Sequence, residues 1–355
     1  MAMLDVFNSD AFSVHSLTAS IEKLPYMPGR IGRMGLFENK PVYDRTVIIE
    51  EKQGSLSLLP VKGRGSQEQT TRREDTRKVH AFVVPHVPHW DALLASDLEG
   101  KRAFGTEDQL EVFARILNDK LENMKADHEV TWEYHRIGAL KGHVLDADGT
   151  STVVNWFTQF GITETEIVFN FYDGGTYDQA DPIADMKALC TQVKRTMQDA
   201  LGATPFKGIH AFCGDAFFDK FVAHATVRKA YERYQENAFA RTLQNDEGGF
   251  EFGGITWENY RGSIGGVDFV DDHEARFFPV GSKGIFVEST APADFVETVN
   301  TAGKPLYAKQ ERMKWDKGIE LHTQSNTLFM CTRPACLIKG VYANAATGTG
   351  TGSDT

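Results

Sequence analysis

No run of eighteen apolar residues occurs in this 355-residue sequence, so no segment is expected to cross a membrane as a helix. The opening residues lack the basic start and apolar stretch of a secretory signal, and carry acids and asparagine instead. We therefore expect a protein that remains in the cytoplasm where it is made. The 41% hydrophobic content is sufficient for a sizeable buried core.

Cysteine is scarce, and its spacing gives no sign of metal or redox chemistry. The chain has 4 cysteines, at positions 190, 213, 331 and 336, and no two of them form a C-x-x-C pair. Cys190, Cys213, Cys331 and Cys336 are therefore expected to be reduced and mostly buried.

Positive charge is in deficit. The chain has 38 lysines and arginines against 49 acidic residues, which gives a formal net charge of -11. Affinity for nucleic acid depends on neutralising phosphates with basic side chains, so broad binding to polyanions is not expected.

Signatures of common catalytic sites are missing as well. His128 and Glu129 begin like the zinc motif H-E-x-x-H, but Trp132 occupies the position of the second histidine. Neither a phosphate-binding P-loop nor a G-x-S-x-G nucleophile elbow is present. Glu133 and Arg136 favour a structural ion pair on a helix over acid–base catalysis. We expect no catalytic residue and no cofactor, and the enzymatic alternative is a hydrolase built on Asp173, Asp178 and Asp181.

A metal site is also disfavoured. His80, His86 and His89 fall within ten residues of each other, which is close enough for their side chains to converge. Pro85 and Pro88 interrupt this stretch, and that pattern favours histidines of a loop or an interface over metal ligands.

Residues 42–85 predict a long two-stranded ribbon. The β-branched stretch 46–49 forms one strand, apolar residues resume at 56–59 after a turn, and 80–84 returns as a further strand. The intervening stretch 62–78 is polar and rich in arginine and lysine. A single two-stranded sheet buries little apolar surface and is marginal in water, so we expect something outside the ribbon to hold it.

A long helix is predicted over residues 104–138. Thr106 is placed to cap it, and Leu110, Leu117 and Leu121 belong to one apolar stripe with three- and four-residue spacing. At 1.5 Å per residue this helix spans about 50 Å.

The remaining pattern alternates strands and helices. We expect strands at 141–145, 165–172 and 207–213, helices at 181–201 and 215–236, short strands within 248–290, and a strand pair at 318–321 and 328–331.

Several short motifs occur in order along nearly the whole chain. They are Pro28-Gly29-Arg30-Ile31-Gly32, Thr46-Val47-Ile48-Ile49-Glu50, Arg64-Gly65, Glu133-Tyr134-His135-Arg136, Asp146-Ala-Asp-Gly149, Trp257-Glu-Asn-Tyr260-Arg261-Gly262, and Gln324-Ser325-Asn326 with Arg333-Pro334. Together they resemble the lambda-type (gpE-like) phage major capsid protein family, which has the HK97 capsid fold. The resemblance implies an α+β protein with an N-arm, an extended β-hairpin E-loop, a long spine helix, and peripheral and axial domains.

This resemblance also implies a division of the chain. The N-arm would be 1–41 and the E-loop with its flanks 42–99. The peripheral domain would combine 100–202, including the spine helix 104–138, with 319–343; the axial domain would be 203–318 and the flexible tail 344–355. Contacts between subunits are expected at Arg30, Phe37, Val47, Ile49, Leu58, Arg64, Arg72, Arg73 and Arg77.

The implied function is self-assembly into hexamers and pentamers of an icosahedral phage head that encloses double-stranded DNA by non-specific contact. Scaffold, portal, maturation protease and a decoration protein are the partners that the family implies, with assembly in the host cytoplasm. An encapsulin-like compartment shell, which has the same fold and encloses enzymes, is the structural alternative.

Overall fold

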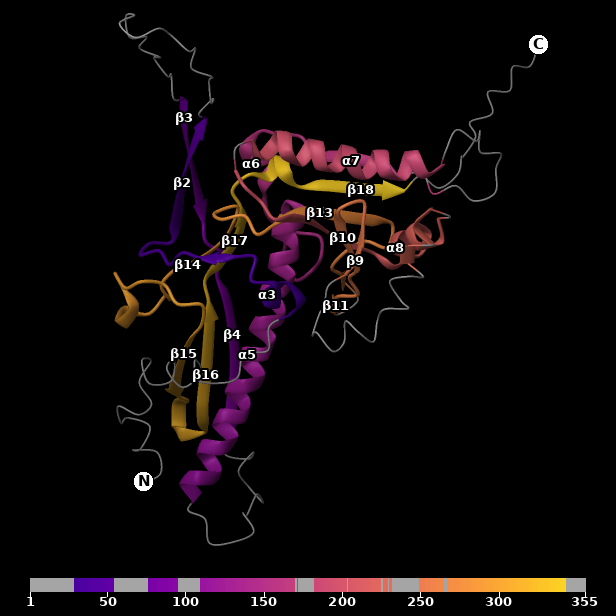
Figure 1. The fold of residues 1–355 in the computed structure, drawn as a ribbon. Coiled ribbons are helices and arrows are strands. Elements are labelled where there is room, and N and C mark those ends of the chain that lie inside the picture. The colour runs from indigo at the N-terminus through magenta and orange to yellow at the C-terminus, as the bar shows by residue number, and fades with distance from the viewer. Residues whose placement is uncertain are drawn as a thin grey trace, which may run out of the picture.

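The computed structural model has two parts joined at an angle (Figure 1). One is an elongated stem formed by a long helix and a narrow sheet, and the other is a broader head built on a larger sheet. The residues described are 29–53, 76–94, 109–169, 171, 182–202, 204–224, 226–228, 230–231, 249–264 and 267–342.

The stem is organised by helix α5, Gln109–Lys141. Its expected apolar stripe is confirmed for Leu117, Leu121 and Met124, which are at most 3% exposed. The helix runs past the expected end at 138 to Lys141. Gly142 follows it with a φ of 85°, a left-handed conformation that glycine adopts readily and that ends the helix. Thr106, the expected cap, lies outside the described residues.

A three-stranded antiparallel sheet packs along α5. Its order is β15 (Tyr307–Arg312), β16 (Gly318–Ser325) and β4 (Val87–Leu94). Leu93, Ile319 and Leu321 point toward α5 and share a buried cluster with its apolar stripe. Successive side chains of β4 and β16 point to opposite faces of the sheet, so every second side chain lies on the face turned away from the helix.

The expected strand pair at 318–321 and 328–331 is wrong in its pairing. Both segments are strands, but β16 pairs with β15 and β4, whereas β17 (Thr327–Cys331) pairs with β14 (Phe286–Thr290). Strand β1 (Glu38–Asn39) adds to the other edge of β14. The last residues of the expected N-arm therefore belong to a sheet of the same chain.

The head contains a mixed six-stranded sheet. Its order is β7 (Thr165–Phe169), β18 (Ile338–Tyr342), β13 (Glu274–Val280), β8 (Gly208–Cys213), β10 (Ile255–Asn259) and β9 (Phe250–Phe252). Helix α7 (Pro182–Leu201) lies along this sheet (Figure 1), and α8 (Asp215–Ala223) contributes Phe217 and Phe221 to the same core. The helix expected at 215–236 is interrupted at His224, which has extended backbone angles.

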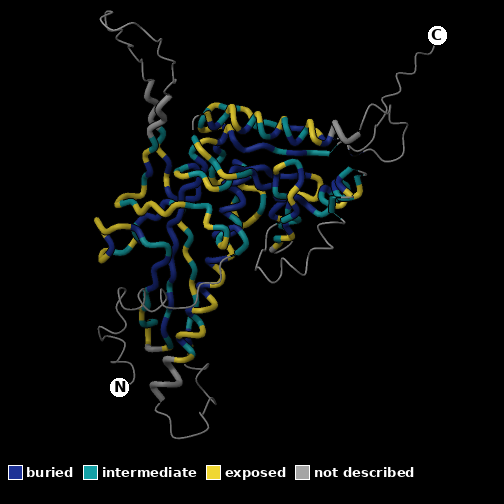
Figure 2. The backbone as a smooth tube through the Cα atoms, in the orientation of Figure 1, coloured by how far each residue is buried: buried dark blue, intermediate teal, exposed yellow. Residues whose placement is uncertain are grey.

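Aromatic rings fill the core of the head. Trp257 on β10 lies between Phe221, with centroids 4.1 Å apart, and Phe277, at 5.2 Å. Phe169 on β7 stacks on Phe277 at 5.8 Å. Such ring pairs add to the stabilisation from their large buried area. The strands of this sheet are largely buried in Figure 2.

Strand pairing cuts across the expected division of the chain. Segments 165–169 and 338–342 share a sheet with 208–213, although the sequence assigned them to a different domain. Conversely, β14 and β15 fall within 203–318 but pair with strands of the stem side. The sheets thus join strands from both expected domains, and the expected division of the chain stays a prediction.

The expected ribbon is confirmed in its described part. Strand β2 (Thr46–Gln53) pairs antiparallel with β3 (Thr76–Val83), and the ribbon projects from the junction of stem and head (Figure 1). The apolar residues expected at 56–59 and the tip lie outside the described residues.

Shorter elements connect these parts. They are α3 (Arg30–Met34), the hairpin β5 (His143–Leu145) and β6 (Thr152–Asn155), α6 (Trp156–Phe160), the pair β11 (Ser263–Ile264) and β12 (Val267–Asp268), and the 3-10 turns η3 (Val296–Thr298), η4 (Lys314–Asp316) and η5 (Pro334–Cys336). In the described part of the chain, no helix is both long and apolar enough to span a membrane. All four cysteines are buried, as expected.

Candidate assembly surfaces and the contacts that support them

Helix α3 is fixed to the long helix by the buried carboxylate of Glu133. The backbone N–H of Ile31 donates to Oε1 at 2.6 Å, and that of Gly32 donates to Oε2 at 3.2 Å. The Tyr260 hydroxyl donates to Oε1 at 3.2 Å, which brings a loop of the head to the same carboxylate. Burial, followed by the charge of Glu133, raises the pKa of Tyr260. One side chain thus joins α3, α5 and the head.

Arg30 adds a second attachment for α3. Its Nε and Nη2 donate to the two oxygens of Glu258 on β10, at 2.6 and 2.8 Å. His210 Nε2 lies 3.0 Å from Glu258 Oε2. Burial alone raises the pKa of Glu258, but hydrogen bonds from His210 and Arg30 lower it below the ordinary value. Arg30 was expected to contact a neighbouring subunit, and it forms this ion pair within its own chain.

Phe37 also contacts its own chain. Its ring centroid lies 5.5 Å from those of Phe286 on β14 and Phe329 on β17. Phe37 was expected at a contact between subunits, and such a contact stays a prediction beside this packing within its own chain.

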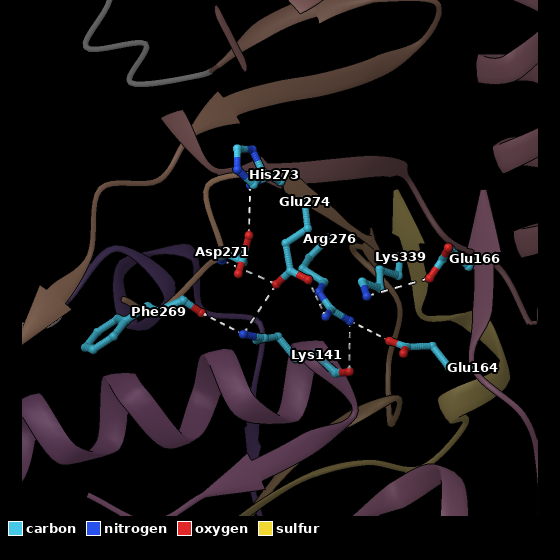
Figure 3. Close-up of polar contacts among 9 residues, drawn as sticks. All are labelled: Lys141, Glu164, Glu166, Phe269, Asp271, His273, Glu274, Arg276 and Lys339. Atoms are coloured by element: carbon cyan, nitrogen blue, oxygen red, sulfur yellow. Dashed lines mark hydrogen bonds and ion pairs between the residues drawn. The ribbon is translucent and has the colours of Figure 1, made fainter. Parts of the chain in front are cut away.

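A buried ionic network joins the end of α5 to the head sheet (Figure 3). Lys141 Nζ lies 3.4 Å from Glu274 Oε1, and Arg276 Nη2 lies 2.7 Å from Glu274 Oε2. Arg276 also pairs with Glu164 and donates to the Lys141 carbonyl at 3.3 Å. The Lys141 ammonium in turn donates to the Phe269 carbonyl at 3.3 Å.

Burial and neighbouring charges have opposite effects on the pKa values of Glu274 and Lys141 in this network. Burial alone raises the pKa of Glu274, but the charge of Arg276 and its hydrogen bonds lower that pKa to about 2. Burial lowers the pKa of Lys141, and the nearby Glu274 carboxylate opposes this shift. The network is therefore a joint whose buried charges compensate one another. Its charged members come from three separate segments, and sequence patterns do not show that these segments meet.

A hollow of about 410 Å³ lies beside this joint, between the end of α5 and the 267–273 loop. Its lining is mixed, with Tyr134, Ile137 and Phe269 next to Asp271 and Lys141. The lysine is already paired with Glu274, as described above. No set of three or more His, Cys, Asp or Glu residues suited to a metal ion occurs within the described ranges.

The three clustered histidines have different partners. His80 packs on the Phe160 ring at 4.7 Å, His86 Nδ1 lies 3.0 Å from Asn326 Oδ1, and His89 Nε2 lies 3.1 Å from Asp127. The structure thus gives each an ordinary structural contact. Asp173, Asp178 and Asp181 lie outside the described residues.

One histidine that the sequence analysis mentioned only in a rejected motif is structurally important. His128 on α5 is 2% exposed, and its Nε2 lies 3.0 Å from Thr323 Oγ1 on β16. Burial, and then the nearby His89 and His322, lower its pKa to about 4. His128 is thus a buried neutral group between the long helix and the sheet.

The base of the ribbon packs on the body of its own chain. Val47 and Phe82 are 7% and 4% exposed and share a cluster with Trp156, Leu328 and Met330. Ile49 packs against the same cluster. At the ribbon base Val47 is buried and Ile49 is partly buried within their own chain, and the expected contacts of both with a neighbouring subunit stay a prediction.

The opposite side of the ribbon base is uncovered. Ile48 and Val83 are 66% and 71% exposed, and Ala81 between them is also exposed. Leu58, Arg64, Arg72 and Arg73 lie outside the described residues, as does the side chain of Arg77. Period-two alternation could have separated Ile48 from Val47, but it could not show which side the chain itself covers.

Comparison with known proteins gives a consistent result. The family described as phage major capsid protein E matches residues 13–342. The major capsid protein of Pseudomonas phage KPP10 is 28% identical over 351 residues, covering 94% of this chain and 97% of the relative. That of Salmonella phage Felix O1 is 26% identical over 378 residues, covering 98% and 100%.

A solved structure supports the fold. A prophage protein from E. coli CFT073, described as a capsid protein, has a TM-score of 0.55 at 13% identity and covers 93% of this chain and 99% of its own. The expected HK97-type fold, with its mixed helices and strands, is confirmed.

Proposed function

The chain belongs to the phage major capsid protein E family, and from this premise we propose that its copies form the hexamers and pentamers of an icosahedral head around double-stranded DNA. The observation that carries the proposal is the family match over residues 13–342, which includes the ribbon, the stem and the head together. The uncovered side of the ribbon base supports it further, since exposed Ile48 and Val83 are suited to contact with another protein surface.

We propose that the head is the axial domain and the stem the peripheral domain. In this arrangement the six-stranded sheet and α7 surround the centre of each ring, and α5 with its three-stranded sheet lies at the ring's periphery. Head-to-tail contacts that close by rotation generate such rings from one kind of subunit.

The enclosed DNA would be held sterically and by non-specific contacts. The net charge of -11 supports this, because an acidic chain offers few cations to neutralise phosphates. Scaffold, portal, maturation protease and a decoration protein remain proposed partners, and assembly is proposed to take place in the host cytoplasm.

Electron microscopy of the chain expressed alone and with its scaffold tests the proposal. We expect closed shells of uniform size containing five- and six-fold rings. Small discrete oligomers at every concentration tested, with or without scaffold, would contradict it.

The encapsulin-like alternative is not favoured by the family assignment. Analysis of particles from infected cells separates the two functions, because a phage head protects double-stranded DNA from nuclease. Particles that instead hold a folded enzyme and no DNA would support the compartment.

A further inference from the structure

The hollow beside the joint between stem and head has aromatic and apolar side chains in its walls. Its volume of about 410 Å³ is within the range of pockets that take small organic molecules. The rings of Tyr134 on α5 and Phe269 lie with their centroids 5.2 Å apart, and Ile137, Leu145 and Val267 also line the space. We refer to this space as the joint hollow.

The walls of the joint hollow are held by the subunit's own packing. The turn 146–149 closes against β12, because a Cβ at Gly149 would lie 3.2 Å from the methyl groups of Val267. At the end of α5, the Lys141 ammonium is held by its ion pair with Glu274. The hollow is therefore already formed in the single subunit, and a ligand does not have to order it.

One polar group of the wall lacks a partner. Tyr134 Oη is buried and makes no hydrogen bond to any residue that the structure describes. Buried hydroxyls in proteins are nearly always hydrogen-bonded, and this one can both donate and accept. Since Tyr134 lines the joint hollow, a polar group of a bound ligand can take up this hydrogen bond.

Carboxylates give the joint hollow a negative charge. Asp268, Asp271 and Asp272 line it, and all three are exposed. Among the described residues of the lining, Lys141 is the one lysine or arginine, and its charge is paired with Glu274 at 3.4 Å (Figure 3). The field in the hollow therefore repels anions and attracts cations.

The walls and the charge together select the class of ligand. A metal ion would need several ligand atoms that converge on one point, and the described ranges contain no such set. An organic cation can instead place its charge near the carboxylates and the faces of the rings, while its hydrocarbon part lies against the apolar side chains Ile137, Leu145 and Val267.

We propose that the joint hollow binds an organic cation, an ammonium or guanidinium group on a short aliphatic stem. The stem lies along Tyr134, Ile137 and Val267, and the charged group lies at Asp268 and Asp272. A free diamine and a lysine or arginine side chain of another protein chain both carry this chemistry, and the experiment separates these two sources. The binding does not depend on the proposed assembly, because the hollow is formed by one subunit. A ligand that binds only the folded chain raises its free energy of unfolding, so the cation would stabilise the contact of stem and head.

Calorimetric titration of the unassembled subunit measures this binding. The probes are diaminobutane for a free amine, and acetyl-lysine amide and acetyl-arginine amide, both blocked at the α-amino group, for a protein side chain. Butanediol is the neutral control. We expect heat of binding from at least one of the cations and none from the diol. Tighter binding of diaminobutane assigns the site to a free amine, and tighter binding of a blocked amino acid assigns it to a side chain of another chain.

Two double variants with the same change of charge test the location. D268N/D272N removes two carboxylates of the hollow and should raise the dissociation constant of the tightest-binding cation by about tenfold or more. D44N/D294N removes two exposed carboxylates outside the hollow and should leave that constant unchanged. V267F narrows the hollow without changing its charge, and should abolish binding while its far-UV circular dichroism stays that of the parent.

Y134F tests the hydroxyl separately, and should weaken binding by about threefold or more because it removes one hydrogen bond. Unchanged affinity in Y134F would overturn the part assigned to this hydroxyl. The site itself would be overturned by the absence of heat from all of the cations, by equal losses of affinity in D268N/D272N and D44N/D294N, or by full binding to V267F.

Discussion

Two buried histidines on α5 make the stability of the subunit dependent on pH. Burial is the main cause that lowers the pKa of both His128 and His135 to about 4, from an ordinary value of 6.5. Above pH 6.5 both the folded and unfolded chains hold these side chains neutral. As the pH falls from 6.5 toward 4, only the unfolded chain takes up the protons, so the free energy of unfolding decreases by up to about 1.4 kcal/mol per pH unit for each histidine.

We therefore expect H128Q to flatten this decrease. Glutamine can retain a hydrogen bond to Thr323 but does not gain a charge in this range. Urea unfolding of unassembled protein at several pH values between 4 and 7 measures the slope. H273Q, at an exposed position, is the control, and an unchanged slope in H128Q would refute the assignment.

Gly29 is required by the closeness of Glu133. A Cβ at this position would lie 2.3 Å from the Glu133 carboxyl carbon, so the carboxylate would have to leave the N–H groups of α3. We expect G29A to lower the free energy of unfolding by about 1–3 kcal/mol. G208A is the control, because a Cβ there would be 3.7 Å from its nearest neighbour. The double variant G29A/E133D should recover part of the loss in urea unfolding, and full stability of G29A would contradict the role of Glu133.

At the scale of elements, Phe82 makes a central aromatic contact between the ribbon base and the body. Phe82 is 4% exposed and meets the Trp156 ring edge-on, with centroids 5.1 Å apart. F82A should cost about 3–5 kcal/mol in the free energy of unfolding, because it removes a large buried side chain. V83A, at a position 71% exposed, should change stability by less than about 0.5 kcal/mol. Equal effects of the two variants on urea unfolding would show that the ribbon base is not packed.

Helices and strands were predictable from the sequence where the apolar residues had a clear periodicity or where a turn or capping residue marked the boundary. The apolar stripe of α5, the strands at 46–49 and 80–83, and the helix behind Pro182 followed from spacing and turn chemistry. The pairing of β16 and β17 with different strands could not be predicted. Both read as apolar strands, and only long-range register, set by β14 and β4, separates them.

The candidate contact residues show the same limit. Arg30, Phe37 and Val47 have the chemistry of interface residues, but that chemistry is equally suited to the interior of a subunit. Sequence patterns specify that a side chain will be covered and do not specify by which copy. The exposed Ile48 became visible as a surface only after the chain's own packing was known.

For the whole molecule, the joint between stem and head is a cluster of buried charged side chains. Removing Arg276 would leave buried Glu274 with the more distant Lys141 as its cation, and would take from the partly exposed Glu164 its ion pair with Arg276 (Figure 3). R276M should therefore destabilise the subunit by about 3–5 kcal/mol in urea unfolding. K339M removes a more exposed pair with Glu166, 3.6 Å long, and should cost less than about 1 kcal/mol. Similar losses in the two variants would contradict a special role for the joint.

The basic stretch 62–78 suggests a prediction for assembly. If it forms a charged strap on acids of an adjacent subunit, reversing Arg72 and Arg73 to glutamate should reduce shell yield at raised salt, where the remaining ion pairs are screened. Sedimentation of shells in a salt series measures this. Unchanged yield across the series would remove the strap and leave a solvated tip.

The short step from β3 to β4 has a mechanical consequence. Only residues 84–86 separate the end of the ribbon from the strand that pairs with β16 along its whole length, from Val87 to Leu94. A force that pulls on the ribbon and reaches β4 along the chain would therefore load all the hydrogen bonds between β4 and β16 in shear at once, instead of breaking them one after another. A force that reaches β4 from the ribbon would thus be borne by the whole β4–β16 ladder.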